Sequence, residues 1–122
     1  TSLTNLTGLE NLVDVNHTIS ISRNDNLTSL NGIQNVIFTD NPANYHELII
    51  NQNANLTNLD PLSNYFYDRG KVNISQNSSL IDLCGISYLV LNMTDFINDH
   101  NFTTGNAYNP GIVNFQNGDC SL

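Results

Sequence analysis

Residues 19–36 read ISISRNDNLTSLNGIQNV, and the same phrase returns twice further along the chain. The second copy is LIINQNANLTNLDPLSNY at 48–65, and the third is VNISQNSSLIDLCGISYL at 72–89. Each copy opens with apolar residues at alternate positions, which is the period of a short strand. An asparagine and a run of spaced leucines follow. An internal repeat of this kind predicts a parallel β solenoid, in which successive windings of the chain stack on one another.

The copies share a register that extends to both ends of the chain. The first leucine of each run recurs with spacings of 24, 29 and 24 residues. Half a copy, SLTNLTGLENL, opens the chain at 2–12, and half a copy, VNFQNGDCSL, closes it at 113–122. The aligned positions are Leu3, Leu27, Leu56 and Leu80; Asn24, Asn53 and Asn77; and Gly8, Gly32, Pro61 and Gly85.

Each part of the repeat has a physical role. The alternating apolar residues are expected to point inward from short parallel strands, at Ile19/Ile21, Leu48/Ile50, Val72/Ile74 and Val113/Phe115. The intervening residues point outward, and they include Ser20, Ser22, Ile49, Asn51, Asn73, Ser75 and Asn114. The aligned asparagines Asn24, Asn53 and Asn77 are predicted to form a buried ladder that satisfies turn peptide groups. Glycine or proline fits the tight bend that follows.

Three segments depart from the repeat. Leu12, Val13 and Val15 are expected to form a short strand on a second face. The loop from Val36 to Glu47 is longer than its counterparts and contains a predicted turn at Asn41-Pro42. Residues 64–70 form an aromatic corner that contains Tyr65, Phe66 and Tyr67.

Residues 89–110 are read as an insertion in the last winding. Leu89, Val90, Met93, Phe96 and Ile97 recur at spacings near three and four, which predicts a short helix. Asn92 or Thr94 is expected to cap it. The whole chain, residues 1–122, is then a single domain with one inserted helical loop.

Composition excludes several classes of protein. The chain has 122 residues, a hydrophobic content of 39% and a net charge of −8. That apolar content supports a core, whereas the negative charge argues against a nucleic-acid-binding protein. No apolar run is long enough to span a membrane. The chain begins in the middle of a repeat, which indicates a mature product or a segment of a larger protein.

The two cysteines, Cys84 and Cys120, allow two interpretations. They are either two buried thiols or a disulfide. Cys120 falls near the place of Leu80 in the repeat, and Cys84 lies one corner away on the preceding winding. Adjacent windings are about 4.8 Å apart at a sheet, so we expect a disulfide that fastens the last winding.

Asparagine sequons are the strongest chemical signal in the sequence. N-glycosylation is predicted for the acceptors Asn5, Asn16, Asn26, Asn55, Asn73, Asn92 and Asn101, provided that the source is eukaryotic. Asn77 also begins a sequon, but as a ladder residue it is expected to carry no glycan. The alternative is that Asn-Leu-Thr belongs to the repeat itself, which applies most to Asn26 and Asn55.

Candidates for metal binding and catalysis are weak. His17, His46 and His100 lie on different loops and are read as surface histidines. No spacing typical of a zinc or calcium site is present, so we expect no metal and no cofactor other than glycans. Nor does the chain contain a hydrolase, metalloprotease or phosphate-binding motif. We therefore expect a protein that is not an enzyme.

The phrase Ile-x-Ile-x-x-Asn-x-x-Leu-x-x-Leu-x-Gly-Ile-x-Asn, read from Ile19 to Asn35, resembles the receptor L-domain type of leucine-rich repeat. That family includes the ligand-binding lobes of insulin-type and EGF-type receptors and many surface proteins. The resemblance covers the chain except residues 89–110. It implies a short right-handed solenoid, an extracellular or cell-surface location, and a partner-binding sheet face or edge.

Two functions follow as expectations. Because the solenoid ends expose a strand edge and an open core, one copy can stack head to tail on the next and build a surface filament or coat. The alternative is an adhesion or ligand-binding domain that binds a protein or glycan through Ser20, Ser22, Ile49, Asn51, Asn73 and Ser75. Small polar residues dominate that face, whereas binding hot spots favour tryptophan, tyrosine and arginine, so the structural function is preferred.

Overall fold

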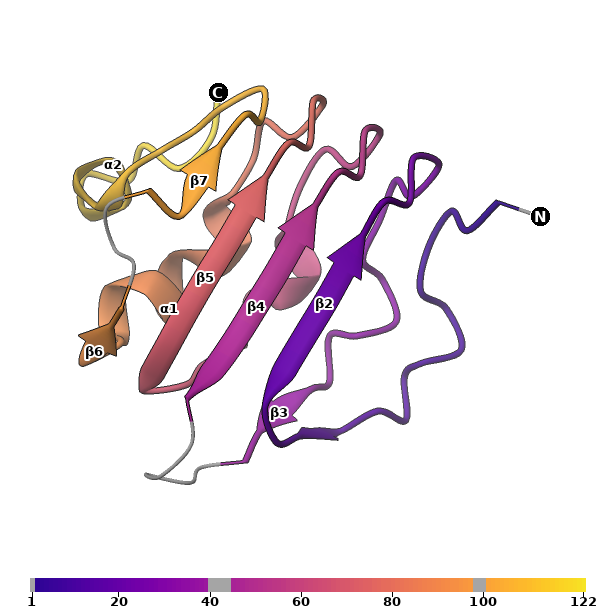
Figure 1. Cartoon of the computed structure of the whole chain (residues 1–122), viewed down its shortest axis with the longest axis horizontal. Helices are drawn as coiled ribbons and strands as arrows, with labels where there is room; N and C mark the ends of the chain where they lie inside the picture. The colour runs from indigo at the N-terminus through magenta and orange to yellow at the C-terminus, as the bar shows by residue number, and fades with distance from the viewer. Residues whose placement is uncertain (1, 40–44, 98–100) are drawn as a thin grey trace.

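The computed structural model describes residues 2–39, 45–97 and 101–122, and it shows a small α/β domain built on a parallel sheet (Figure 1). Most segments between the strands are irregular, with short helices at the back of the molecule. In chain order the elements are β1 (Asp14–Val15), β2 (Thr18–Ser22), β3 (Ile37–Phe38), β4 (His46–Asn51), the 3-10 helix η1 (Asp60–Leu62), β5 (Arg69–Ser75), the 3-10 helix η2 (Cys84–Ile86), α1 (Ser87–Asn92), β6 (Asp95–Phe96), β7 (Thr103–Thr104) and α2 (Ile112–Gln116).

The main sheet has β2 at one edge and then β4 and β5, with β6 and β7 both pairing with the far side of β5. All these pairs are parallel, and the register places Ile21 beside Ile50, Ile50 beside Ile74, and Ile74 beside Thr103. Side chains of one face therefore stack in rows across the strands, as the repeat predicts. A separate parallel pair, β1 with β3, confirms a short strand at Val15, but the strand begins at Asp14 and leaves out Leu12 and Val13, which were also expected in it.

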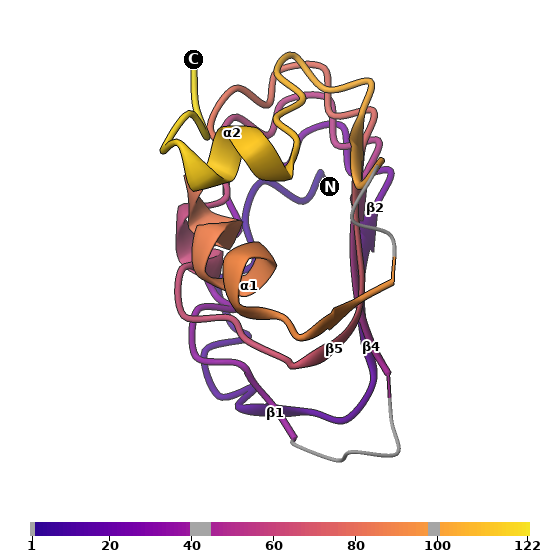
Figure 2. The same ribbon diagram turned by 90° about the vertical axis from the view of Figure 1, so that its left-hand side faces the viewer.

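Each strand leads into a segment that crosses the back of the molecule and returns to start the next strand (Figure 2). We call a strand with its return segment a winding. Winding 1 begins at β2, winding 2 at β4, winding 3 at β5 and winding 4 at β7. The segment 2–15 precedes winding 1 and lies against its return segment, where the Thr28 amide donates to the Thr4 carbonyl at 2.9 Å.

The core lies between the sheet and the return segments. Leu27, Leu56 and Leu80 are fully buried there, as their repeat positions predict. The buried apolar residues of the described chain form one cluster, which runs from Leu6 to Cys120. Burial of these apolar side chains between neighbouring windings makes the main favourable contribution to the stability of the fold.

Two glycines let neighbouring windings approach backbone to backbone. A Cβ at Gly32 would lie 1.9 Å from the Leu6 carbonyl oxygen, and a Cβ at Gly85 would lie 1.8 Å from that of Leu59. Both distances are shorter than atoms can tolerate. Gly32 and Gly85 are therefore required by close contact with the preceding segment of the chain, in addition to the bend predicted for them, whereas an added Cβ at the aligned Gly8 would meet nothing within 4 Å.

The predicted last strand at Val113–Phe115 is wrong, because α2 occupies Ile112–Gln116. The side chain of Asn114, expected to point outward from a strand, instead accepts a hydrogen bond from the Gly111 amide at 2.9 Å and caps this helix. Val113 is 65% exposed, whereas Phe115 is buried. Val113 and Phe115 therefore lie on opposite sides of a short helix, because residues two apart in an α-helix are separated by about 200° around its axis.

The last strand of the sheet is β7, which pairs with β5 at Ile74 and Ser75. Residues 89–110 are consequently not an insertion. They hold the return segment of winding 3 and the strand that starts winding 4.

The structure also differs from two smaller predictions. The expected helix exists as α1, but it begins at Ser87, without a side-chain cap, and it ends at Asn92, so neither Asn92 nor Thr94 caps its start. His46, read as a surface residue, is only 4% exposed. The predicted turn at Asn41-Pro42 and the side chain of His100 fall outside the described residues.

Candidate interaction surface at the N-terminal end

Side-chain amides join the windings just after their strands. Asn53 donates from Nδ2 to the Ile21 carbonyl of the preceding winding at 2.9 Å, and its Oδ1 accepts from the Asn24 backbone amide at 3.1 Å. Asn77 repeats both contacts one winding further, with the Ile50 carbonyl and the Asn53 amide. The predicted ladder of Asn24, Asn53 and Asn77 is confirmed, and both Asn53 and Asn77 bond to the winding before them.

The ladder has a fourth rung that sequence analysis missed. Asn106 donates to the Ile74 carbonyl at 2.8 Å and accepts from the Asn77 amide at 3.0 Å. Its spacing from Asn77 is 29 residues, the same as from Asn24 to Asn53. That spacing could have identified Asn106 as a rung from the sequence alone. It was not recognised because Thr103 occupies the position at which the other strands have isoleucine.

The C-terminal end of the ladder is closed within the chain. The backbone amide of Asn106, which a following winding would bond, donates instead to Oδ1 of Asn109 at 2.9 Å. The Asn109 Nδ2 in turn donates to the Asn106 carbonyl at 2.9 Å. Asn109 thus takes the place of a fifth rung.

The N-terminal end of the ladder is open. Nδ2 of Asn24 donates to the carbonyl of Ser22 in its own winding at 3.1 Å. The other three rungs instead donate to the winding before them. Among the described residues no donor pairs with Oδ1 of Asn24, although this side chain is only partly exposed. The two ends of the ladder are therefore different.

Strand β2 is the sheet edge beside this open rung. Among residues 2–39, 45–97 and 101–122 it has one strand neighbour, β4. The Arg23 amide donates to the Asn51 carbonyl at 3.0 Å, and the Glu47 amide donates to the His17 carbonyl at 3.1 Å. The backbone amides and carbonyls of the odd-numbered residues of β2 therefore point toward β4. In a parallel ladder alternate residues serve opposite sides, so the peptide groups of Ser20 and Ser22 face the open edge.

An apolar groove of about 430 Å³ lies along this edge. It occupies the space that a strand preceding β2 would fill, because segment 2–15 contributes a return segment without a strand in line with β2. Its apolar wall includes Leu3, Leu6, Leu9, Leu12, Ile19 and Ile33. Leu3 is 50% exposed although its repeat partners are fully buried.

A second row of polar side chains follows the strand ends. Arg23, Gln52 and Gln76 each adopt positive φ, and Gly105 continues the row with φ 68°. Nε of Arg23 donates to Gln52 at 2.8 Å, and Nε2 of Gln52 donates to Gln76 at 3.0 Å. These side chains pair with one another, so the row joins neighbouring windings at the surface beside the buried ladder.

The opposite ends of the strands hold an aromatic cluster. The rings of Phe38, His46, Tyr65 and Tyr67 pack edge-on or tilted at 4.9–5.4 Å between centroids. Burial raises the pKa of Tyr65 and Tyr67 above the usual range. The Tyr65 hydroxyl donates to the Ile33 carbonyl at 2.7 Å. Two residues of the predicted aromatic corner, Tyr65 and Tyr67, are therefore part of the core, whereas Phe66 is exposed.

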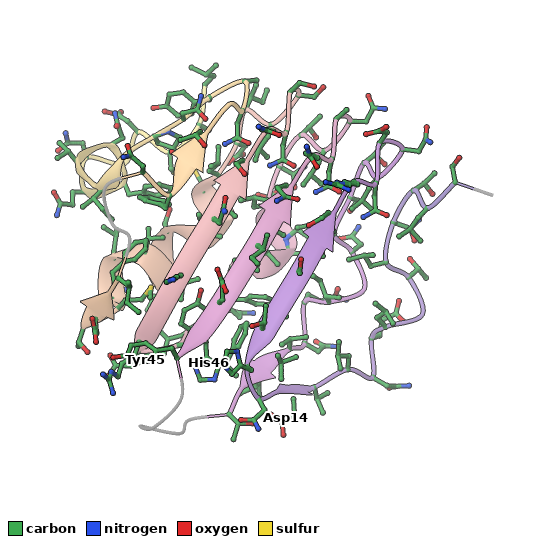
Figure 3. The ribbon with its side chains drawn as sticks, viewed as in Figure 1. Asp14, Tyr45 and His46 are labelled. Carbon is green, nitrogen blue, oxygen red and sulfur yellow. A yellow bond between two sulfur atoms is a disulfide. The ribbon has the colours of Figure 1, made fainter. Side chains whose placement is uncertain are left out.

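Tyr45 lies beside His46 in sequence and near the same end of the sheet, where Asp14 also lies (Figure 3). The guanidinium of Arg69 stacks on the Tyr45 ring at 4.5 Å and forms an ion pair with Asp95 at 3.3 Å. These groups are exposed or half-buried, so the ion pair contributes little to stability.

The predicted glycan acceptors lie at the surface. Asn5, Asn16, Asn26, Asn55, Asn73, Asn92 and Asn101 are all exposed, whereas Asn77 is fully buried. Asn73 projects from the outward face of β5. Accessibility is consistent with the predicted acceptors, and their occupancy stays a prediction.

Cys84 and Cys120 form a disulfide with their Cα atoms 4.9 Å apart, as predicted. The register argument behind that prediction was wrong. With Asn106 in the place of Asn77, the residue equivalent to Leu80 is Asn109. Cys120 lies instead in an antiparallel return, where the Leu83 amide donates to the Cys120 carbonyl at 2.9 Å and Ser121 pairs with Asp82.

Other classes of site find no support in the part of the chain that the structure describes. No three histidine, cysteine, aspartate or glutamate side chains gather there as metal ligands. The described helices are all too short, or too polar, to cross a bilayer.

Comparison of the chain with protein-family models, with curated proteins and with solved structures gives no match.

Proposed function

We propose that this chain is a short right-handed solenoid of the leucine-rich-repeat, receptor L-domain-like type, and that it is a structural subunit of an extracellular filament or coat. The fold proposal is supported by the in-register parallel strands, the fully buried leucines and the amide ladder. The right hand follows from the strong preference of parallel crossover connections.

The observation that carries the structural function is the difference between the two ends. Asn109 closes the ladder at the C-terminal end, whereas Asn24, the β2 edge and the apolar groove leave the N-terminal end open. An unprotected strand edge with an apolar groove is a site of association. We propose that a neighbouring subunit joins the chain at this end.

The head-to-tail joint expected from the sequence needs one change. A copy that continued the ladder beyond Asn106 would have to displace Asn109 from the Asn106 amide. We therefore propose that the joint uses the N-terminal groove of one copy and a segment other than the regular last winding of the next. The contact is still heterologous, so it builds chains of subunits.

The alternative, adhesion through the outward sheet face, has less support. None of the outward positions of β2, β4 and β5 is aromatic, and Ser20, Asn73 and Ser75 are small or polar. A glycan on Asn73 would also cover the middle of this face. Non-enzymatic assembly therefore fits the described surface better than ligand capture on the sheet.

Sedimentation velocity over a range of concentrations, combined with electron microscopy, tests this function. Leu3→Asp places a charge in the groove, and the matched Phe66→Asp places one on an exposed apolar residue of winding 2, away from both ends. We expect concentration-dependent oligomers in the wild type and in Phe66→Asp, and a monomer in Leu3→Asp. A wild-type chain that stays monomeric at the highest concentrations would contradict the proposed assembly.

A further inference from the structure

We propose that the N-terminal groove binds one extended strand of another polypeptide, which adds parallel to β2 and directs alternate apolar, uncharged residues into the groove. This inference deepens the proposed function, because it identifies the chemistry of the segment that enters the joint. It rests on the open rung at Asn24, the free edge of β2 and the apolar lining of the groove.

The direction of the strand follows from the rungs that are already filled. Asn53 bonds the carbonyl of the inward residue Ile21 and the backbone amide of Asn24, three positions further along and just after the end of β2. Asn77 bonds Ile50 and Asn53 in the same way. The amide points to the same side as the carbonyl because the residue before it has positive φ. A segment that runs parallel to β2 and ends in the same turn presents a carbonyl and then an amide at this spacing. An antiparallel strand presents them in the opposite order.

Asn24 has the groups that such a strand requires. Its Nδ2 now donates to the local Ser22 carbonyl at 3.1 Å, and its Oδ1 has no donor among the described residues. A parallel strand would supply both partners and release the Ser22 carbonyl, which belongs to the open edge of β2. The carbonyl and the amide that Asn24 requires belong to the backbone, so residues of any type in the incoming strand can supply them. This contact therefore fixes the direction of the incoming strand but does not require that strand to contain an asparagine.

The edge of β2 adds main-chain hydrogen bonds. Ser20 and Ser22 direct their peptide groups away from β4, and residues 18–22 contain no proline, charge or other feature that protects an edge strand. Strand addition at such an edge derives affinity from the backbone and specificity from pockets for alternate side chains.

The groove selects the side chains of the incoming strand. Inward side chains of neighbouring strands form two rows across the sheet. The first row consists of Ile19, Leu48 and Val72, and the second consists of Ile21, Ile50 and Ile74. The next member of each row would point into the groove between Leu3, Leu6 and Leu12. The groove lining carries no charged residue, and the chain carries a net charge of −8, so an inward acidic residue would be excluded.

The experiment uses a labelled peptide with the sequence of residues 71–77, KVNISQN, and the full chain at concentrations where it is monomeric. The control peptide KNVSIQN has the same composition but moves the apolar residues to the other face of a strand. We expect fluorescence anisotropy to show saturable binding of the first peptide and at least about tenfold weaker binding of the second. NMR shifts should localise to Ser20, Ser22 and Asn24.

Two variants block the site by different means. Ser20→Pro removes an edge amide, and Leu3→Asp charges the groove, whereas Val113→Asp serves as the control at the far end. We expect both blocking variants to lose peptide binding and the control to retain it. Circular dichroism of each variant confirms that it is folded, so Leu3→Asp still decides the result if Ser20→Pro destabilises the sheet.

The outcomes separate this inference from the proposed function. Peptide binding by a chain that never self-associates would support the groove and contradict the filament. Self-association that persists in Leu3→Asp and is not inhibited by the peptide would overturn the groove while leaving an assembly function. Equal binding of the two peptides, or shifts that map elsewhere, would overturn the proposed strand chemistry.

Discussion

At the scale of single residues, the fold depends on side chains whose partners are in the next winding. Asn77 is fully buried and serves both neighbours, since it bonds the Ile50 carbonyl, the Asn53 amide and Asn106. Its repeat partner Asn24 has neighbours on one side only. Residues that are equivalent in the repeat are therefore unequal in their contribution to stability.

Asn77→Ala should destabilise the chain by about 3 kcal/mol, because it leaves the buried Asn53 amide without an acceptor. Asn24→Ala should cost less than about 1 kcal/mol, since the Asn24 backbone amide keeps its bond to Asn53. Urea denaturation followed by circular dichroism measures both. Equal losses for the two variants would show that the ladder is not directional.

Gly85→Ala should destabilise the chain by more than about 3 kcal/mol, because its Cβ would lie 1.8 Å from the Leu59 carbonyl oxygen. Gly111→Ala is the matched control, since its Cβ would meet only Asn114 Oδ1 at 3.8 Å. We expect this control to change the free energy of unfolding by less than about 1 kcal/mol. Thermal unfolding of the two variants decides the comparison, and a well-folded Gly85→Ala would rule out the close approach of windings.

At the scale of elements, the sequence predicted β2, β4 and β5, the buried leucines and three rungs of the ladder. These elements repeat a strong local pattern, so each copy supports the others. The last winding was misread because Thr103 replaces an isoleucine and β7 has only two residues. The Val113–Phe115 alternation then offered a false strand, and helix capping by Asn114 was not recognised.

The groove could be predicted only in part. The lack of a strand in the first half-repeat was visible in the sequence, and so was the expectation of an exposed edge. The closed C-terminal end was not, because it depends on Asn109 folding back on Asn106 within a turn of four residues. Repeat alignment describes what windings share, and therefore says little about the ends where they differ.

The disulfide fastens the irregular last winding to η2. The double variant Cys84→Ala/Cys120→Ala should lose about 3–4 kcal/mol of stability, from the 36-residue separation that the bridge closes. Urea denaturation of this variant and of the reduced wild type should give similar losses. A loss below about 1 kcal/mol in both would mean that the last winding is held by other contacts.

The aromatic cluster predicts a loss of stability at alkaline pH. Burial raises the pKa of Tyr65 and Tyr67 in the folded chain, so the unfolded chain releases these protons first. The contribution of these two tyrosines to the free energy of unfolding should be constant below the ordinary tyrosine pKa of about 10 and fall as the pH rises above it. Tyr65→Phe should show a shallower fall in denaturation curves at stepped pH. An unchanged slope would contradict the role assigned to burial.

At the scale of the whole molecule, the strands of the described chain lie side by side in one parallel sheet whose two ends differ. Asn109, α2 and the disulfide finish the C-terminal end, whereas we propose that β2, Asn24 and the groove accept a strand at the N-terminal end. This asymmetry connects the fold to the proposed assembly, since it gives the subunit a direction.

Hydrogen exchange resolved by residue, measured by NMR on the monomeric chain, tests this asymmetry most directly. The backbone amides of Asn53 and Asn77 donate to buried side-chain oxygens, and that of the buried Asn106 donates to Oδ1 of Asn109, so we predict strong protection for all three. The amides of Ser20 and Ser22 should exchange at nearly unprotected rates. Protection of the two serine amides as strong as that of Asn77 would contradict an open N-terminal edge.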